Sequence, residues 1–161
     1  MAKDTFSLNI SIQQYNPDEL SDTEKVWVNE AIEAAKQAYA PYSGFQVGAA
    51  VILADGQIVT GSNQENAAYP SGICAERVAL FYAGAKYPDL PVKAIVIAAC
   101  RDGIIQQPTA PCGACRQVML ETEMRYRNQL RIILYGSDIV YEASSAEVLL
   151  PLAFNNTFIN K

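Results

Sequence analysis

Hydrophobic and polar residues alternate near the start of the chain. Four apolar side chains between residues 4 and 15 fall on one face of an extended segment: Phe6, Leu8, Ile10 and Ile12. This alternation predicts a strand, or an extended arm laid on the rest of the protein. Asn16 and Pro17 break the pattern, so we divide the chain into an arm or strand over 1–20 and a single domain over 21–161.

Helical spacing replaces alternation in the next segment. Ser21 and Glu24 stand three residues apart, as in a capping box. Apolar residues then follow at helical intervals and predict an amphipathic helix: Val28, Ala31, Ile32, Ala35 and Tyr39. After this helix, two apolar runs over 45–53 and 57–61 are joined by a turn at Asp55 and predict a β-hairpin.

The rest of the chain alternates helices and strands. In order, the pattern predicts a helix over 74–85, a strand over 92–100, a loop over 101–111, a helix over 112–125, strands over 130–135 and 139–142, and a short helix after Ser144. The helix over 74–85 is apolar almost all round, as in helices buried on most sides. Together these elements predict the α/β class: a three-layer α/β/α sandwich with one mixed sheet of about five strands.

Composition excludes several kinds of chemistry and of partner. The chain has 161 residues with 17 acidic and 12 basic side chains, a net charge of −5, which disfavours a nucleic-acid partner. It contains no histidine, which excludes Ser-His-Asp and Cys-His hydrolysis and histidine-based metalloprotease sites. No apolar run approaches 18 residues and no signal segment is present, so we expect no membrane partner and a cytoplasmic protein with reduced thiols.

Three of the four cysteines lie in two short segments, 74–77 and 111–116, and each segment opens a predicted helix. The positive end of a helix dipole favours the thiolate form that metals require. Without imidazole, the thiolates of Cys74, Cys112 and Cys115 are the obvious ligands for one zinc ion. Three protein ligands leave a fourth tetrahedral position for water, which distinguishes catalytic from structural zinc.

Two neighbours of Cys74 suit such a site. Glu76 follows it by two residues, and a carboxylate beside activated water can act as the general acid and base. Three thiolates on Zn²⁺ sum to a charge of −1, which makes bound water less acidic. Arg77 can offset this charge by donating hydrogen bonds to the sulfurs.

Other interpretations of the cysteines remain open. Cys112 and Cys115 have the Cys-x-x-Cys spacing of a redox dithiol. Cys100 ends a predicted strand and could join the other three in a closed structural zinc site. Cys100 could equally be a small buried residue with no ligand role.

Taken together, Cys-Ala-Glu and the later Pro-Cys-x-x-Cys resemble the signature of the zinc-dependent nucleoside deaminases. Three further segments, 45–50, 61–69 and 149–154, resemble the remaining sequence blocks of the small cytidine deaminases. The resemblance covers roughly residues 22–154. It implies a cytidine deaminase-like fold in which residues 21–161 form one zinc-dependent deaminase domain.

The resemblance also implies residue roles. By position these are zinc ligation by Cys74, Cys112 and Cys115, proton transfer by Glu76, and substrate contacts from Phe45, Asn63, Glu65 and Ala75. Phe45 would pack against the pyrimidine, and Asn63 and Glu65 would hold the ribose 3′-hydroxyl. The implied reaction converts cytidine and deoxycytidine into uridine and deoxyuridine with release of ammonia, in pyrimidine salvage, with one zinc per subunit.

Small members of this family are homotetramers whose sites are completed by neighbouring subunits. Tyr69 and Phe154 match the aromatic residues at those intersubunit sites. The chain departs from the family pattern at Leu152, where glycine is common, and in its alternating N-terminal segment, which the shortest members lack.

Plainer roles compete with these. Phe45 could be strand core, Asn63 and Glu65 could bind their own loop, Arg77 and Arg116 could be surface charges, and Tyr69 and Phe154 could belong to the core of one subunit. Two other functions also compete: deamination of a cytosine-nucleoside antibiotic, and a noncatalytic interaction domain stapled by a four-cysteine zinc site.

Overall fold

A computed structural model describes residues 3–159 of the chain. Within them, seven strands form one mixed sheet: β1 (Gln13–Tyr15), β2 (Gln46–Leu53), β3 (Ile58–Ser62), β4 (Val92–Arg101), β5 (Ile104–Ile105), β6 (Arg131–Tyr135) and β7 (Val140–Ala143). The strand order is β1-β7-β6-β4-β2-β3, with β5 paired to β4. Only the β4–β6 pair is parallel among the described strands.

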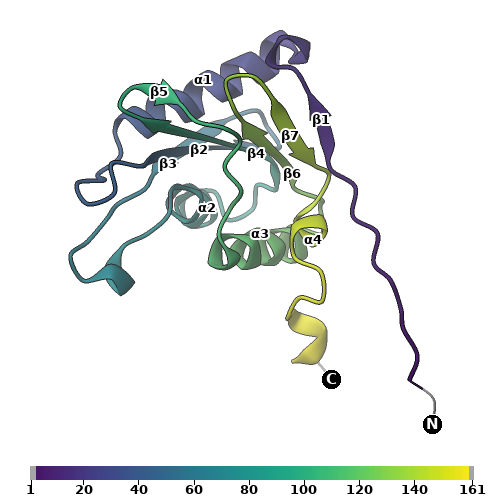
Figure 1. Cartoon of the computed structure of the whole chain (residues 1–161). Helices are drawn as coiled ribbons and strands as arrows, with labels where there is room; N and C mark the ends of the chain where they lie inside the picture. Colours follow the sequence, from purple (N-terminus) through teal and green to yellow (C-terminus); the bar gives the residue numbers. More distant parts are fainter. Residues whose placement is uncertain (1–2, 160–161) are drawn as a thin grey trace.

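Helices cover both faces of this sheet (Figure 1). They are α1 (Asp22–Lys36), α2 (Ala75–Lys86), α3 (Gly113–Tyr126) and the short α4 (Ala146–Leu149). The first helix lies on one face, and α2 and α3 lie on the other, which confirms the predicted α/β/α sandwich. Within residues 3–159, no helix is long and apolar enough to cross a bilayer.

The central strand β4 shows why the sheet needs helices on both sides. Ile95 and Ile97 pack in the core on the α2–α3 side, whereas Val96 packs in the core beneath α1. All three side chains are buried. Residues 94–100 of this strand are covered on both faces and have no solvent-facing position, so their sequence is apolar without alternation.

Two glycines let helices lie directly on the sheet. A Cβ atom at Gly48 in β2 would lie 2.0 Å from the carbonyl oxygen of Ala31 in α1. A Cβ atom at Gly61 in β3 would lie 2.7 Å from the carbonyl oxygen of Ala75 in α2. Because real Cβ atoms do not approach backbone this closely, both positions require glycine.

The sheet has seven strands instead of the predicted five or so, because β5 was missed and the N-terminal segment, predicted as a strand or an arm, contributes β1. The loop predicted over 101–111 contains β5, since Asp102 and Gly103 both adopt left-handed backbone angles and fold the chain back onto β4. The strand predicted over 4–15 pairs only at Gln13–Tyr15, because its partner β7 ends at Ala143.

The rest of the N-terminal segment has no strand structure between residues 3 and 12. Its four alternating apolar side chains are all exposed: Phe6, Leu8, Ile10 and Ile12. The division of the chain at residue 20 stays a prediction, and residues 1–2 and 160–161 of those ranges lie outside the described part.

Leu152 has a backbone φ of +56°, in the left-handed region that favours glycine. This conformation costs a residue with a side chain about 1–2 kcal/mol. The structure therefore gives a physical reason for the glycine that the resemblance implies at this position.

Candidate metal centre and active site

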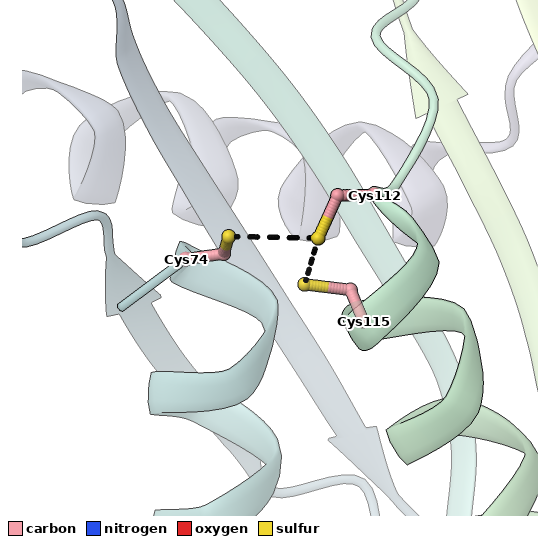
Figure 2. A group of neighbouring side chains, drawn as sticks. All are labelled: Cys74, Cys112 and Cys115. Atoms are coloured by element: carbon pink, nitrogen blue, oxygen red, sulfur yellow. Dashed lines mark hydrogen bonds between the residues drawn. The ribbon is translucent and has the colours of Figure 1, made fainter. Parts of the chain in front are cut away.

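Three cysteine side chains point toward one another where α2 and α3 begin (Figure 2). Cys74 precedes α2, Cys112 precedes α3, and Cys115 lies in the first turn of α3. The Sγ atoms of Cys74 and Cys112 are 3.8 Å apart, and those of Cys112 and Cys115 are 3.4 Å apart. All three Sγ atoms lie within 4.8 Å of one another.

This triangle of sulfurs fits zinc. At a Zn–S distance of 2.3 Å, tetrahedral ligands stand about 3.8 Å apart, close to the spacings observed. Cys100 is buried in β4 and does not belong to the group of candidate ligands. A closed four-cysteine site is therefore excluded, and a third sulfur beside Cys112 and Cys115 does not fit an isolated redox pair.

One of the three sulfurs, that of Cys74, already favours the thiolate form. A hydrogen bond from the Cys115 thiol, followed by contributions from Arg77 and Cys112, lowers the pKa of Cys74 to about 5. The same interaction with Cys74, together with burial, raises the pKa of Cys115. One negative charge is thus held between these two cysteines, as a cation site requires.

Arg77 faces this negative charge. Its Nη2 atom lies 3.8 Å from the Cys74 Sγ atom, to which it donates a hydrogen bond. Its Nε atom is buried and has no partner within the described residues. Because an unpaired buried donor is costly, this N–H can serve a further sulfur or an anion at the site.

Glu76 lies beside the sulfurs in the first turn of α2 and is only 4% exposed. Burial raises the pKa of its carboxyl group, and the negative charge of Cys74 raises it further. A carboxyl group that binds protons more readily than an exposed glutamate suits the transfer of a proton near neutral pH.

A cavity of about 630 Å³ opens above these residues. Nine of the residues predicted for the site line it: Phe45, Asn63, Glu65, Tyr69, Cys74, Ala75, Glu76, Arg77 and Cys112. Cys115 lies beneath, fully buried. Phe154 does not line the cavity, and its exposed ring instead stacks on Phe158 with the ring centroids 5.7 Å apart.

Asn63 joins the start of β2 to the end of β3. Its Oδ1 atom accepts a hydrogen bond from the Val47 N–H at 2.7 Å, and its Nδ2 atom donates to the Phe45 carbonyl oxygen at 3.0 Å. The amide still has one donor hydrogen and one acceptor lone pair to offer a ligand. The side chain therefore binds the start of β2 and not its own loop, and this contact is compatible with the predicted sugar contact.

Glu65 is held in the same way by a neighbouring turn. Its carboxylate accepts hydrogen bonds from the backbone N–H groups of Tyr42 and Ser43 and from the Ser43 hydroxyl. The Ser43 hydroxyl, followed by the Tyr42 N–H, lowers the pKa of Glu65. The group is thus an anionic acceptor that lines the cavity with lone pairs to spare.

Sequence reasoning missed Tyr42 and Ser43, which line the cavity and orient Glu65. Their only signal was the turn composition of residues 41–44. Arg116, weighed as a surface charge, is a partly buried link that donates to the carbonyl oxygens of Pro111 and Leu149.

Comparison with known proteins places this geometry in context. Residues 21–127 match the family model of the cytidine and deoxycytidylate deaminase zinc-binding region. The cytidine deaminase of Sporosarcina psychrophila is 46% identical over 137 residues, which are 83% of this chain and 92% of that protein. The cytidine deaminase of Halalkalibacterium halodurans is 49% identical over 94 residues, 58% of this chain and 67% of that protein.

A solved structure has the same fold. The crystal structure of cytidine deaminase from Burkholderia pseudomallei superimposes with a TM-score of 0.68 at 40% sequence identity. The match covers 81% of this chain and 98% of that one.

Proposed function

The chain belongs to the cytidine and deoxycytidylate deaminase family, and on this premise we propose that it hydrolyses cytidine and deoxycytidine to uridine and deoxyuridine with release of ammonia. It is a hydrolytic deaminase with zinc as its cofactor. The observation that carries the proposal is the triangle of three cysteine sulfurs with a buried carboxyl group beside it, on the wall of one cavity.

Cys74, Cys112 and Cys115 would hold the metal. When bound there, zinc supplies a Lewis acid that makes water acidic enough to be a nucleophile near neutral pH. Arg77 would donate to the sulfurs and balance their negative charge, which its contact with Cys74 and its unpaired Nε atom support.

Glu76 would move the protons. Its carboxylate takes a proton from the attacking water and delivers it to N3 of the pyrimidine, which makes C4 electrophilic. The same group would then take the proton of the hydroxyl now bonded to C4 and pass it to the amine, so that the C4 carbonyl forms as the C4–N bond breaks and ammonia leaves as a neutral molecule. Its burial supports this role, because a carboxyl group with a raised pKa holds and releases protons readily near neutral pH.

The cavity walls would position the nucleoside. The ring of Phe45 offers a flat apolar surface for the pyrimidine, and Ala75 lies on the wall between Cys74 and Glu76. Asn63 and Glu65 would bind the ribose 3′-hydroxyl, each with hydrogen-bonding capacity left over. No group in this set distinguishes the ribose of cytidine from that of deoxycytidine, so both are expected as substrates.

We further propose a homotetramer in which neighbouring subunits complete each site. Tyr69 and Phe154, the two predicted intersubunit aromatics, are 77% and 61% exposed, and Phe81 and Tyr82 of α2 are exposed as well. Exposed apolar side chains are often the ones that other subunits cover, so these residues support an interface between subunits. A cytoplasmic location, where thiols stay reduced, and a role in pyrimidine salvage complete the proposal, with residues 21–161 as the deaminase domain.

The loss of cytidine absorbance on conversion to uridine tests this function. We expect zinc-loaded wild type to turn over cytidine and deoxycytidine, and Glu76→Gln to lower kcat by about 10²–10⁴-fold while zinc content is retained. Glu123→Gln is the matched control, since Glu123 is a second buried acid and lies outside the cavity. Equal turnover by wild type and Glu76→Gln, or activity only toward a cytosine-nucleoside antibiotic, would contradict the proposal.

A further inference from the structure

Arg101 lies against the ring of Phe45 from outside the cavity. Its guanidinium carbon is 5.4 Å from the centroid of that ring. The register of the sheet explains the contact: Gln46 of β2 pairs with Cys100 of β4, so Phe45 and Arg101 occupy the next positions along the same antiparallel ladder. A guanidinium within about 6 Å of an aromatic face is attracted to the π-electrons of the ring.

The same guanidinium reaches the turn beside the ring. Arg101 Nη2 donates to the carbonyl oxygen of Ser43 at 3.5 Å. The Ser43 hydroxyl accepts from the Phe45 N–H at 3.0 Å and donates to the Glu65 carboxylate. Between Ser43 and Phe45, Gly44 has a φ of +64°, and even a Cβ atom at this position would contact nothing, so residue 44 does not hold the turn in place.

Arg101 itself does not line the cavity. It is exposed at the end of β4, so any effect on a ligand must pass through Phe45 and Ser43, which do line it. An unheld ring and turn would have to be ordered each time a ligand binds, and that ordering lowers affinity. If Arg101 already holds the Phe45 ring and the Ser43 turn in place, the pocket has its binding shape before the ligand arrives.

We propose that Arg101 is a positioning residue for the nucleoside: it fixes the ring of Phe45 and the turn at Ser43, so that the base-binding wall and Glu65 are set before substrate binds. The inference rests on the proposed function, in which the Phe45 ring packs against the pyrimidine. Cytidine is uncharged, so the positive charge of Arg101 does not act by attracting the substrate from a distance.

Steady-state kinetics with Arg101→Met, Arg101→Lys and a matched control test this. Lys93→Met removes another cation from β4, one whose Nζ atom lies 5.9 Å from the ring centroid of Trp27, remote from the cavity. We expect Arg101→Met to raise KM for cytidine by about 3- to 10-fold with kcat within about twofold of wild type, as loss of one exposed cation–π contact and one hydrogen bond predicts.

Arg101→Lys should fall between wild type and Arg101→Met, since lysine keeps the cation but not the planar donor group. Lys93→Met should leave KM unchanged even if it lowers the melting temperature as much as Arg101→Met does. The inference is overturned if KM for Arg101→Met equals that of wild type, if kcat falls instead of affinity, or if Lys93→Met raises KM equally. Failure of wild type to deaminate cytidine would instead overturn the proposed function, and this inference with it.

Discussion

The start of α1 and the starts of α2 and α3 are built on different principles. Ser21 caps α1: its hydroxyl accepts from the Glu24 N–H, and the Glu24 carboxylate accepts from the Ser21 N–H at 2.8 Å. Cys74 and Cys112 occupy the same cap position on α2 and α3, but neither side chain binds the helix backbone. Their sulfurs contact each other instead.

The difference shows where local stability gives way to function. A serine cap stabilises a helix by about 1 kcal/mol, and α2 and α3 lack that contribution. In exchange, their positive ends favour the thiolates that bind a cation. We therefore expect the α1 start to hold by itself, and the α2 and α3 starts to depend on the metal between them.

The largest effect is expected from removing one of the three sulfurs at the starts of α2 and α3. Cys112→Ser should lower bound zinc from one per chain to below about 0.1 and activity by about 10³-fold or more, because two thiolates hold zinc poorly. Metal analysis and the cytidine assay measure both effects. Cys100→Ala is the control, since Cys100 lies outside the cluster, and equal loss of zinc from that variant would refute the three-sulfur assignment.

Removal of zinc from the intact protein should destabilise the starts of α2 and α3 but not the start of α1. After chelation, we expect amide hydrogen exchange in the first turns of α2 and α3 to quicken by up to about 100-fold, as loss of a ligand held at 100 times its Kd predicts. The first turn of α1 should keep its protection, and added zinc should reverse the change. Uniform loosening of all three helices would show that α1 is not independent.

Arg131 makes the stability of the fold around α1 depend on pH. It binds both Glu24 and Glu142, and Tyr15 also donates to Glu142. Burial would raise the pKa of Glu142, but hydrogen bonds from Arg131 and Tyr15 lower it overall. Burial would also raise the pKa of Glu24, but hydrogen bonds from Ser21 and Arg131 outweigh this effect and lower the pKa.

Acids with a lowered pKa bind protons less readily in the folded state, so they stabilise the fold above the ordinary glutamate pKa of about 4.3. That stability is lost as pH falls through the lowered pKa values. Arg131→Met should cost about 1–3 kcal/mol of unfolding free energy at pH 7, and its difference from wild type should shrink toward pH 3.

Chemical denaturation at both pH values tests this expectation. Lys36→Met, which removes an exposed ion pair to Glu33, should cost less than about 0.5 kcal/mol at either pH. A gap between wild type and Arg131→Met that stays constant with pH would contradict the assigned network.

The smallest effect concerns the cap itself. Ser21→Ala should lower the free energy of unfolding by about 1 kcal/mol, because it leaves the Glu24 N–H without its partner. Ser145 stands at the same position on α4 without a side-chain cap bond, so Ser145→Ala should cost less than about 0.5 kcal/mol. Equal losses in the two variants, measured by thermal denaturation, would mean that the hydrogen bond at Ser21 contributes nothing specific.

Features set by neighbours in sequence could be predicted. The capping box at Ser21 and Glu24 spans three residues, and Cys74 and Glu76 lie in one helical turn, so short spacing alone brought each pair together. The two segments that carry the sulfurs could be paired in advance only because their residue types suggested a shared metal.

Features set by strand order could not be predicted. Arg131 of β6 meets Glu24 of α1 although the two residues lie far apart in the sequence. Tyr15 meets Glu142 only because β1 pairs with β7. Arg101 reaches Phe45 through the register of β2 with β4. Hydrophobic patterning assigns each strand a buried face but does not say which strand lies beside it.

Gly61 limits which substitutions this protein can accept. A side chain there would place its Cβ atom 2.6 Å from the Ala79 nitrogen and 2.7 Å from the Ala75 oxygen, forcing β3 away from α2. Asn63 directly follows that strand and Glu76 lies on that helix, so the displacement would separate the amide proposed to bind the sugar from the acid proposed to transfer protons. In a library that randomises every position and selects for activity, residue 61 should accept glycine alone, although it does not line the cavity, because a larger residue would change the distance between Asn63 and Glu76.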